Sequence, residues 1–221
     1  MIVFDLDGTL VDSAEEIVGA MDRAWNAIVD STVHGPFPRE RFRIGPPLTD
    51  IVRELSPGLS AEERDALTTE FRALYDASDF SRTTPYAGVL EALGSLANRG
   101  ERLCVATNKR RAPTLAIVAR WFPECFAEIA CIDGVWPDDG TRPGEKSAML
   151  AWLMARVTGS GSRAIMIGDT PGDIMAARKV GVRAIAVTWG YERTSTLADS
   201  QPDALVDDVP SLLAAISSVR T

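Results

Sequence analysis

Short apolar runs recur along the chain, and helical patterns separate most of them. Five of the runs are nearly continuous in apolar character, as is typical of parallel strands covered on both faces. They span residues 2–6, 103–106, 128–132, 164–167 and 184–187. Between the runs, apolar residues recur at helical spacing, as in Val89, Leu93 and Leu96, which precede a helix-stopping Gly100. This alternation predicts an α/β fold with a doubly wound parallel sheet.

Residues 12–84 interrupt the alternation because they contain no convincing strand. Ser13 and Glu16 have the spacing of a capping box that opens a helix, and Ser60 and Glu63 repeat it further along. A structureless loop of this length is uncommon inside a compact domain. We therefore predict that residues 12–84 form an inserted, all-helical cap, and that residues 1–11 and 85–221 form the α/β core.

Composition and charge narrow the possible classes of protein. The 221 residues carry a formal net charge of −8, which opposes nonspecific binding to nucleic acid. The sequence has no run of 18 apolar residues, and its first predicted strand begins at Ile2, so we expect neither a membrane span nor a signal peptide. The three cysteines have neither metal-site spacing nor a paired framework. These features favour a cytoplasmic protein.

The end of the first predicted strand carries the strongest chemical signal. Alternate residues of a strand share a face, so Asp5 and Asp7 point the same way, and Gly8 then lets the chain turn. Two carboxylates this close repel each other unless a cation or a shared proton relieves them, and Mg²⁺ takes oxygen ligands. The alternative is a strand end followed by an ordinary polar turn.

Polar residues also follow two other predicted strands. They are Thr107, Asn108, Asp169 and Asp173. Ligands of open α/β sheets bind outside the carboxyl ends of the strands, so these side chains are expected at one edge together with the first two aspartates. Lys146 opens a later helix and could reach the same edge. The set predicts a site for Mg²⁺ and a phosphate group.

Each of these residues also has a purely structural interpretation. Thr107 and Asn108 could cap the following helix, and Asp173 could be only the N-cap of its own helix. Asp169 could belong to a structural turn, and Lys146 could be a solvated side chain. The coincidence of all of them at successive strand ends favours the site.

Three motifs resemble those of the haloacid dehalogenase-like (HAD) hydrolase superfamily. They are Asp5-Leu6-Asp7-Gly8-Thr9, Ala106-Thr107-Asn108-Lys109 and Gly168-Asp169-Thr170-Pro171-Gly172-Asp173. Within that superfamily, the segments Phe42–Leu48 and Thr188–Tyr191 look like those of phosphoglycolate phosphatase and its relatives. The resemblance extends over essentially the whole chain and implies a Rossmann-like core with a helical cap.

The resemblance implies a role for each residue of the motifs. Asp5 would be the nucleophile that forms an aspartyl-phosphate, and Asp7 would be the general acid and base. Thr107 and Asn108 would hold the phosphoryl oxygens, and Lys146 would offset their charge. Mg²⁺ would be bound by Asp5, the Asp7 carbonyl and Asp169, with Asp173 either as a further ligand or as a residue that supports the ligands.

Two further basic residues are relevant to substrate binding. Arg43 lies beside Gly45-Pro46-Pro47 and could meet a substrate carboxylate, although it could equally be a solvent-exposed arginine. Lys109 follows Thr107 and Asn108 at the strand end, and we expect it to turn toward the cap or the solvent rather than toward the phosphate.

The resemblance implies a Mg²⁺-dependent phosphatase that acts on a small phosphorylated metabolite, with 2-phosphoglycolate as the leading substrate. Alternatives are a sugar-phosphate phosphatase, a pyrophosphatase, a nucleotidase, a phosphoglucomutase or a non-catalytic binding protein on the same fold. The related phosphonoacetaldehyde hydrolases need a cap lysine that forms a Schiff base, and residues 12–84 contain no lysine. True dehalogenases lack the aspartate two residues after the nucleophile, so Asp7 favours phosphate over halide chemistry. We expect no nucleic-acid or membrane partner, and either a monomer or a homodimer.

Overall fold

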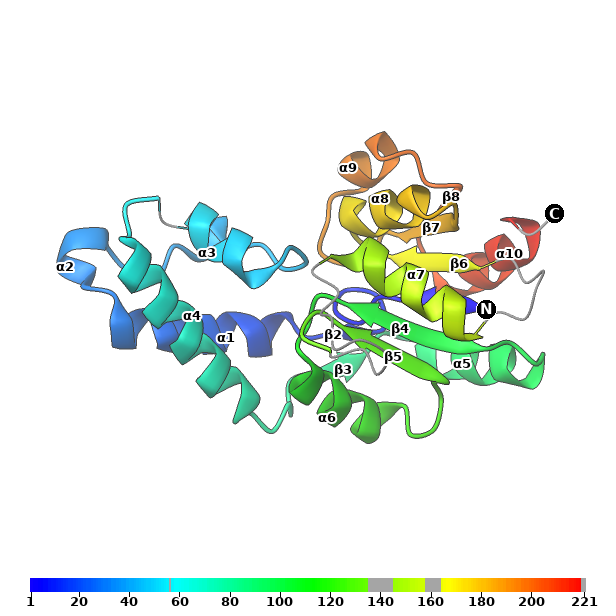
Figure 1. The fold of residues 1–221 in the computed structure, drawn as a ribbon, viewed down its shortest axis with the longest axis horizontal. Helices are drawn as coiled ribbons and strands as arrows, with labels where there is room; N and C mark the ends of the chain where they lie inside the picture. Colours follow the sequence, from blue (N-terminus) through cyan, green and yellow to red (C-terminus); the bar gives the residue numbers. More distant parts are fainter. Residues whose placement is uncertain (56, 135–144, 158–163, 220–221) are drawn as a thin grey trace. The chain divides into compact units, whose positions relative to one another are not determined.

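The computed structural model describes residues 1–55, 57–134, 145–157 and 164–219, and its core is a six-stranded parallel sheet (Figure 1). The strand order is β5-β4-β1-β6-β7-β8, so that the first strand lies in the middle of the sheet. The strands are β1 (Ile2–Phe4), β4 (Leu103–Thr107), β5 (Glu128–Cys131), β6 (Ile165–Gly168), β7 (Arg183–Val187) and β8 (Ala204–Val206). The predicted doubly wound α/β fold is confirmed.

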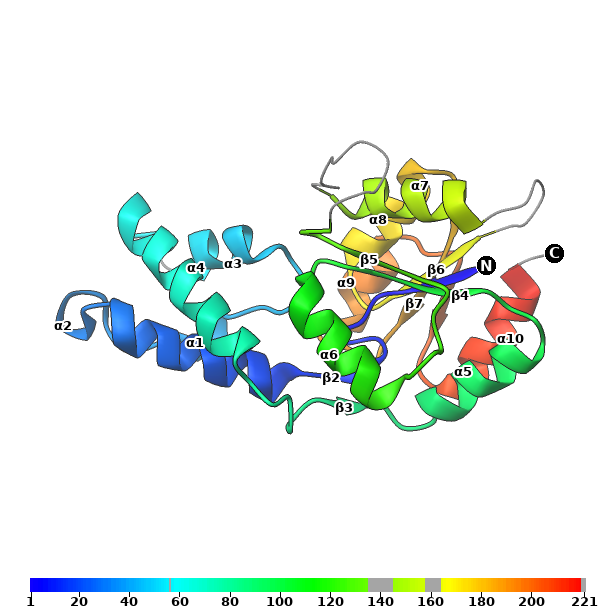
Figure 2. The ribbon, with the colours of Figure 1, turned by 60° about the horizontal axis from the view of Figure 1, so that its bottom comes forward.

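Helices cover both faces of this sheet, as Figure 2 shows. On one side lie α7 (Lys146–Val157) and α8 (Pro171–Lys179). On the other lie α5 (Val89–Asn98), α6 (Arg111–Trp121) and α10 (Val209–Val219). A short helix, α9 (Thr194–Asp199), follows β7. None of the helices that the structure describes is long and apolar enough to cross a membrane.

The apolar core is split by the sheet into two layers, because successive strand residues face opposite sides. Val3 of β1 packs in a cluster with Leu150 of α7 and Ile174 of α8. Its neighbour Phe4 lines a small apolar space with Leu93 of α5 on the opposite side. Burial on both faces explains why β1 reads as a continuous apolar run in the sequence.

Residues Ser13–Thr83 form a compact unit of their own, and the core unit comprises Met1–Asp12 and Thr84–Thr221. The unit is helical. Its elements are α1 (Ala14–Ile28), α2 (Ser31–His34), the 3₁₀ helix η1 (Arg39–Arg41), α3 (Leu48–Leu55) and α4 (Ala61–Asp76). The long helices α1 and α4 pack together, and Trp25 and Leu67 are fully buried in this unit.

The core unit places the two ends of this insertion next to each other. Strand β2 (Val11–Asp12) and strand β3 (Thr84–Pro85) form a two-stranded antiparallel ladder in which Val11 pairs with Pro85. The chain therefore leaves the core unit and returns to it through neighbouring strands.

One of the two predicted capping boxes forms, and the other does not. The Ser60 side chain accepts a hydrogen bond from the Glu63 N–H at 3.1 Å, and Glu63 accepts from the Ser60 N–H at 2.7 Å. The box predicted at Ser13 is wrong, because Ser13 makes no side-chain capping bond. The Glu16 carboxylate is buried and instead accepts from the Ser78 hydroxyl and the Arg82 N–H. It thereby ties α1 to the segment after α4.

Candidate active site

The carboxyl ends of three adjacent strands create the candidate site. Asp5 directly follows β1, and Asp169 directly follows β6. The Asp5 N–H donates to the Ile167 carbonyl at 2.9 Å, so the segments of β1 and β6 are still hydrogen-bonded where the aspartates begin. Thr107 ends β4 on the other side of β1. The sheet thus aligns these polar residues at one edge.

Lys146 connects two of the aspartates. Its Nζ lies 2.9 Å from Oδ2 of Asp5 and 2.6 Å from Oδ1 of Asp173. All three side chains are almost completely buried. Position 146 is the first residue of α7, so the helix start sets the ammonium group against the edge of the sheet. The solvated alternative for Lys146 is thus excluded.

Asp173 serves the helix and the site at the same time. The N-cap of α8 is Thr170, and Asp173 is the third helical residue of a capping box. Its Oδ2 accepts from the Thr170 N–H at 3.0 Å and the Thr170 hydroxyl at 2.7 Å. Its Oδ1 remains for Lys146. Asp173 is therefore not the N-cap itself, because the N-cap is Thr170, three residues earlier. Asp173 belongs both to the capping box and to the group of charged residues around Lys146.

Asp169 is held from two sides and is fully buried. Its Oδ1 accepts from the Thr9 hydroxyl at 3.1 Å, and its Oδ2 accepts from the Tyr191 N–H at 2.9 Å. Gly8 and Gly190 pack so close to this side chain that a Cβ at either position would overlap it. Gly8 also has a φ of +80°, which glycine adopts without strain. These contacts fix the orientation of the Asp169 carboxylate.

Burial and charge act against each other in this cluster. Burial raises the pKa of Asp5 to about 6, although the neighbouring Lys146 opposes the rise. Burial also raises the pKa of Asp169 well above its usual range. Burial would lower the pKa of Lys146, but the carboxylates of Asp173 and Asp5 outweigh it and raise that pKa. Burial thus disfavours the ionised forms of Asp5 and Asp169, and the positive charge of Lys146 offsets part of that cost.

The donor set fits a hard divalent cation. Asp5, Asp169 and Asp173 each offer a carboxylate oxygen, and these oxygens lie within 4.8 Å of one another. When the four motif aspartates are ionised, the ammonium groups of Lys109 and Lys146 offset two of their four negative charges. A divalent cation would balance the other two, and its preferred ligands are oxygens. The chemistry and charge of the cluster therefore suit Mg²⁺.

Lys109 is the site residue that the sequence analysis placed incorrectly. Its Nζ donates to both oxygens of Asp7, at 2.8 and 2.9 Å, and its side chain is only 6% exposed. The expectation that it could turn toward the solvent is wrong. Strands β1 and β4 pair in parallel with Phe4 opposite Val105, so the chains that follow them leave the sheet at the same level. That adjacency of β1 and β4 is the signal that could have located Lys109.

Thr107 and Asn108, which precede Lys109 in the second motif, lie at the same strand end. Thr107 is buried, and its hydroxyl accepts from the Lys109 N–H at 3.1 Å. Asn108 is half-buried directly after β4. Both residues are at the edge of the sheet where Asp5 begins.

Arg43 belongs to the inserted unit. It lies between η1 and α3 and is exposed. The contacts that define the aspartate cluster all lie within the core unit.

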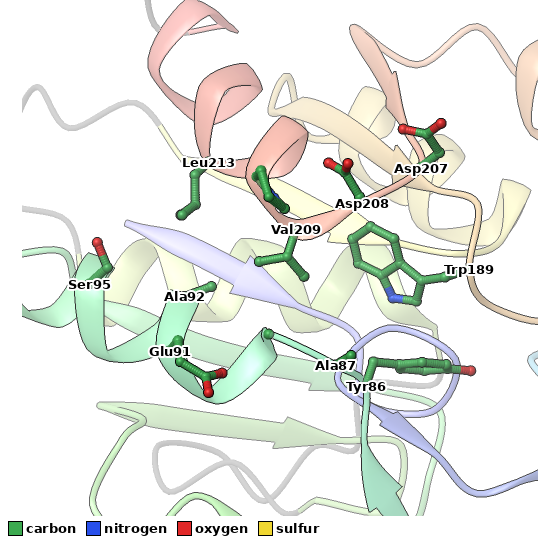
Figure 3. A pocket seen from close by; sticks show the side chains of 12 residues that line it. Tyr86, Ala87, Glu91, Ala92, Ser95, Trp189, Asp207, Asp208, Val209 and Leu213 are labelled. Carbon is green, nitrogen blue, oxygen red and sulfur yellow. The ribbon is translucent and has the colours of Figure 1, made fainter.

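An open pocket of about 650 Å³ lies in the core unit, lined mainly by residues of α5 and α10 and their flanking loops, and Figure 3 shows its lining. Tyr86, Val209 and Leu213 form part of its apolar wall, together with Trp189. The Trp189 Nε1–H donates to the Thr9 carbonyl at 3.1 Å. The pocket, which the sequence did not reveal, thus shares Trp189 with the loops that hold Asp169.

Comparison with known proteins identifies relatives over most of the chain. The model of one family, described as haloacid dehalogenase-like hydrolase, matches residues 2–187. The tyrosine-protein kinase PtkA of Mycobacterium tuberculosis is 34% identical over 195 residues, which cover 87% of this chain and 63% of PtkA. The phosphoglycolate phosphatase of Caulobacter vibrioides is 33% identical over 196 residues, which cover 86% of this chain and 79% of that enzyme. This chain thus spans less than two thirds of PtkA.

The fold of this chain is also similar to that of a solved structure. The crystal structure of a predicted phosphatase from Clostridium acetobutylicum is 27% identical, with a TM-score of 0.79. The match covers 98% of this chain and 97% of that one.

The close approach at Gly190 predicts a specific sensitivity. Gly190→Ala would drive a Cβ into the Asp169 side chain and the Gly8 carbonyl oxygen. Overpacking of this kind costs about 1–3 kcal/mol, so the urea midpoint of unfolding should fall. Gly94→Ala is the control, because that glycine lies inside α5 with no neighbouring atom within 4 Å. It should stabilise the protein by about 0.5–1 kcal/mol. Similar shifts for both variants would contradict the packing at Gly190.

Proposed function

This chain belongs to the haloacid dehalogenase-like hydrolase family, and we propose that it is a Mg²⁺-dependent phosphatase that hydrolyses a small organic phosphate monoester. The observation that carries the proposal is the buried Asp5, which is paired with Lys146 and lies beside Asp169 and Asp173. The phosphoglycolate phosphatase of Caulobacter vibrioides makes 2-phosphoglycolate the first substrate to test.

In the proposed reaction, an Asp5 oxygen attacks phosphorus while the bond to the leaving oxygen breaks. Asp7 gives its proton to the leaving oxygen, and the product alcohol departs. Water then attacks the aspartyl-phosphate and gives a proton to Asp7, which releases inorganic phosphate and restores Asp5. Covalent catalysis of this kind divides one difficult hydrolysis into two easier steps.

The remaining residues would bind charge rather than exchange protons. Thr107 and Asn108 would donate hydrogen bonds to the phosphoryl oxygens, and Lys146 would keep Asp5 oriented while offsetting negative charge. Asp5, Asp169, Asp173 and the carbonyl of Asp7 would hold Mg²⁺. The bound ion would supply a positive charge that orients the phosphoryl group and stabilises its transferring oxygens.

Residues 12–84, which contain the helical unit Ser13–Thr83, are proposed as a cap that contributes substrate specificity. Arg43 is its proposed contact with a substrate carboxylate. Other substrates remain alternatives: a sugar phosphate, pyrophosphate, a nucleotide or, for a mutase, a hexose phosphate. The relative PtkA is named a tyrosine kinase, so transfer from ATP to a tyrosine peptide belongs in the same assay panel. Release of inorganic phosphate from monoesters without an acceptor would distinguish the phosphatase from both transferases.

Replacement of the nucleophile tests the proposal directly. Asp5→Asn should lower turnover of 2-phosphoglycolate and of p-nitrophenyl phosphate on the order of 10³-fold or more, because an amide is a poor nucleophile. Substrate binding, measured by calorimetry, should survive. Asp199→Asn makes the same chemical change at an exposed position at the end of α9 and should leave turnover unchanged. An Asp5→Asn protein with near wild-type turnover would refute the covalent role.

Metal removal gives a second test, with a readout besides activity. Activity should vanish in EDTA and return with Mg²⁺, whereas Ca²⁺ should inhibit because its looser coordination misplaces the reacting groups. Mg²⁺ should also raise the thermal midpoint of the unreacted protein, since it binds the folded state. Asp169→Asn should lose that rise in midpoint. Full activity in metal-free buffer would exclude the proposed role of the ion.

The role of the inserted unit is tested at Arg43. A charged hydrogen bond contributes about 1.5–3 kcal/mol, so Arg43→Ala should raise KM for 2-phosphoglycolate about tenfold or more. It should leave KM for p-nitrophenyl phosphate unchanged, because that leaving group bears no carboxylate. Arg53→Ala is a matched control, since Arg53 is an exposed arginine of α3. Its guanidinium lies 3.1 Å from the carboxylate of Asp50 in the same helix. Equal effects on both substrates would place Arg43 outside substrate recognition.

A further inference from the structure

The two lysines of the site have separate partners. Lys146 lies between Asp5 and Asp173, whereas Lys109 donates to both oxygens of Asp7. Both lysine side chains are only 6% exposed. Both lysines contribute to the charge balance of the site, but Lys109 does so at Asp7, and its role is therefore sought there.

The position of Lys109 is fixed by backbone and side chain together. Its N–H donates to the Thr107 hydroxyl at 3.1 Å, which tightens the turn after β4. The side chain then reaches across to the loop after β1, where the Asp7 side chain is only 12% exposed. An ion pair with so little solvent contact is screened far less than a surface pair. The pair can therefore hold the Asp7 carboxylate in one orientation.

The geometry also leaves Asp7 able to accept a proton. Each carboxylate oxygen has two lone-pair positions, and the Lys109 ammonium uses one on each oxygen. An ionised and oriented carboxylate is what a general base needs, and the nucleophile Asp5 is two residues away in the chain.

We propose that Lys109 is a positioning residue that holds the Asp7 carboxylate as the base for the second half of the reaction. In that step, water forms a bond to phosphorus, the bond between phosphorus and the Asp5 oxygen breaks, and the water proton passes to Asp7. This inference rests on the proposed phosphatase function and deepens it, because it separates the task of Lys109 from that of Lys146.

The test follows the first turnover and the later turnovers separately. With p-nitrophenyl phosphate and Mg²⁺, the leaving group departs without help from an acid, so the first turnover reports formation of the aspartyl-phosphate. In Lys109→Met, the first turnover should change less than about threefold, while steady turnover should fall about 10²-fold, the scale of a lost general base. A burst of p-nitrophenolate that approaches one equivalent per protein should appear, and acid-quenched protein should carry phosphate on Asp5.

Three further variants separate positioning from structural damage. Lys109→Arg keeps the charge and should restore much of the steady turnover. Lys179→Met is the matched control, because Lys179 pairs with Glu145 at an exposed position, 62% exposed, at the end of α8. It should show no burst. In an Asp7→Asn background, Lys109→Met should cause no further loss, because residues that act through one another are not additive.

Each other outcome has a definite meaning. Equal slowing of the first and later turnovers, or a raised KM without accumulated phospho-protein, would overturn the proposal and assign Lys109 to substrate binding. Thermal unfolding identifies a misfolded variant, in which case Lys109→Gln provides a second neutral replacement with the same expected burst. A wild-type protein without activity on any monoester would instead overturn the proposed function, and this inference with it.

Discussion

The architecture of this protein depends on the need to bury several carboxylates beside the end of one central strand. A buried ionised carboxylate without partners is very costly, so each of these side chains requires its own compensation. Asp5 and Asp173 share Lys146, Asp7 has Lys109, and Asp169 relies on a hydroxyl and a backbone N–H. The partners come from segments far apart in the sequence, so the site forms only when β4, β1 and β6 are aligned side by side.

Structural and chemical tasks coincide in this arrangement. The capping box of α8 consumes one oxygen of Asp173 and leaves the other for Lys146, so the start of the helix and the site are fixed by one residue. The loop with Trp189 and Tyr191 acts similarly, because Trp189 donates to the Thr9 carbonyl and the Tyr191 N–H donates to Asp169. Few of these residues can change for one purpose without affecting the other.

The sequence predicted what burial and local spacing determine, and it missed what depends on distant partners. Five strands could be predicted from their apolar runs, and three of them, β1, β4 and β6, are buried throughout, whereas β8 is short and partly exposed. The family resemblance of the motifs is confirmed by the match over residues 2–187. Glu16 had the spacing of a cap, but Ser78 and Arg82 claim its carboxylate. Lys109 was misplaced because its partner, Asp7, lies about a hundred positions earlier and is brought near only by the pairing of β1 with β4.

The two-stranded ladder of β2 and β3 has a consequence for how the chain can be rebuilt. Asp12 and Thr84 are paired neighbours, and antiparallel neighbours can be joined by a turn of two residues. Closing so short a loop loses less conformational entropy than bringing together the ends of a long insertion. The α/β core therefore does not need residues 13–83 to close its own backbone. Helical insertions of different length or chemistry could therefore be exchanged between Asp12 and Thr84 while the sheet keeps its register.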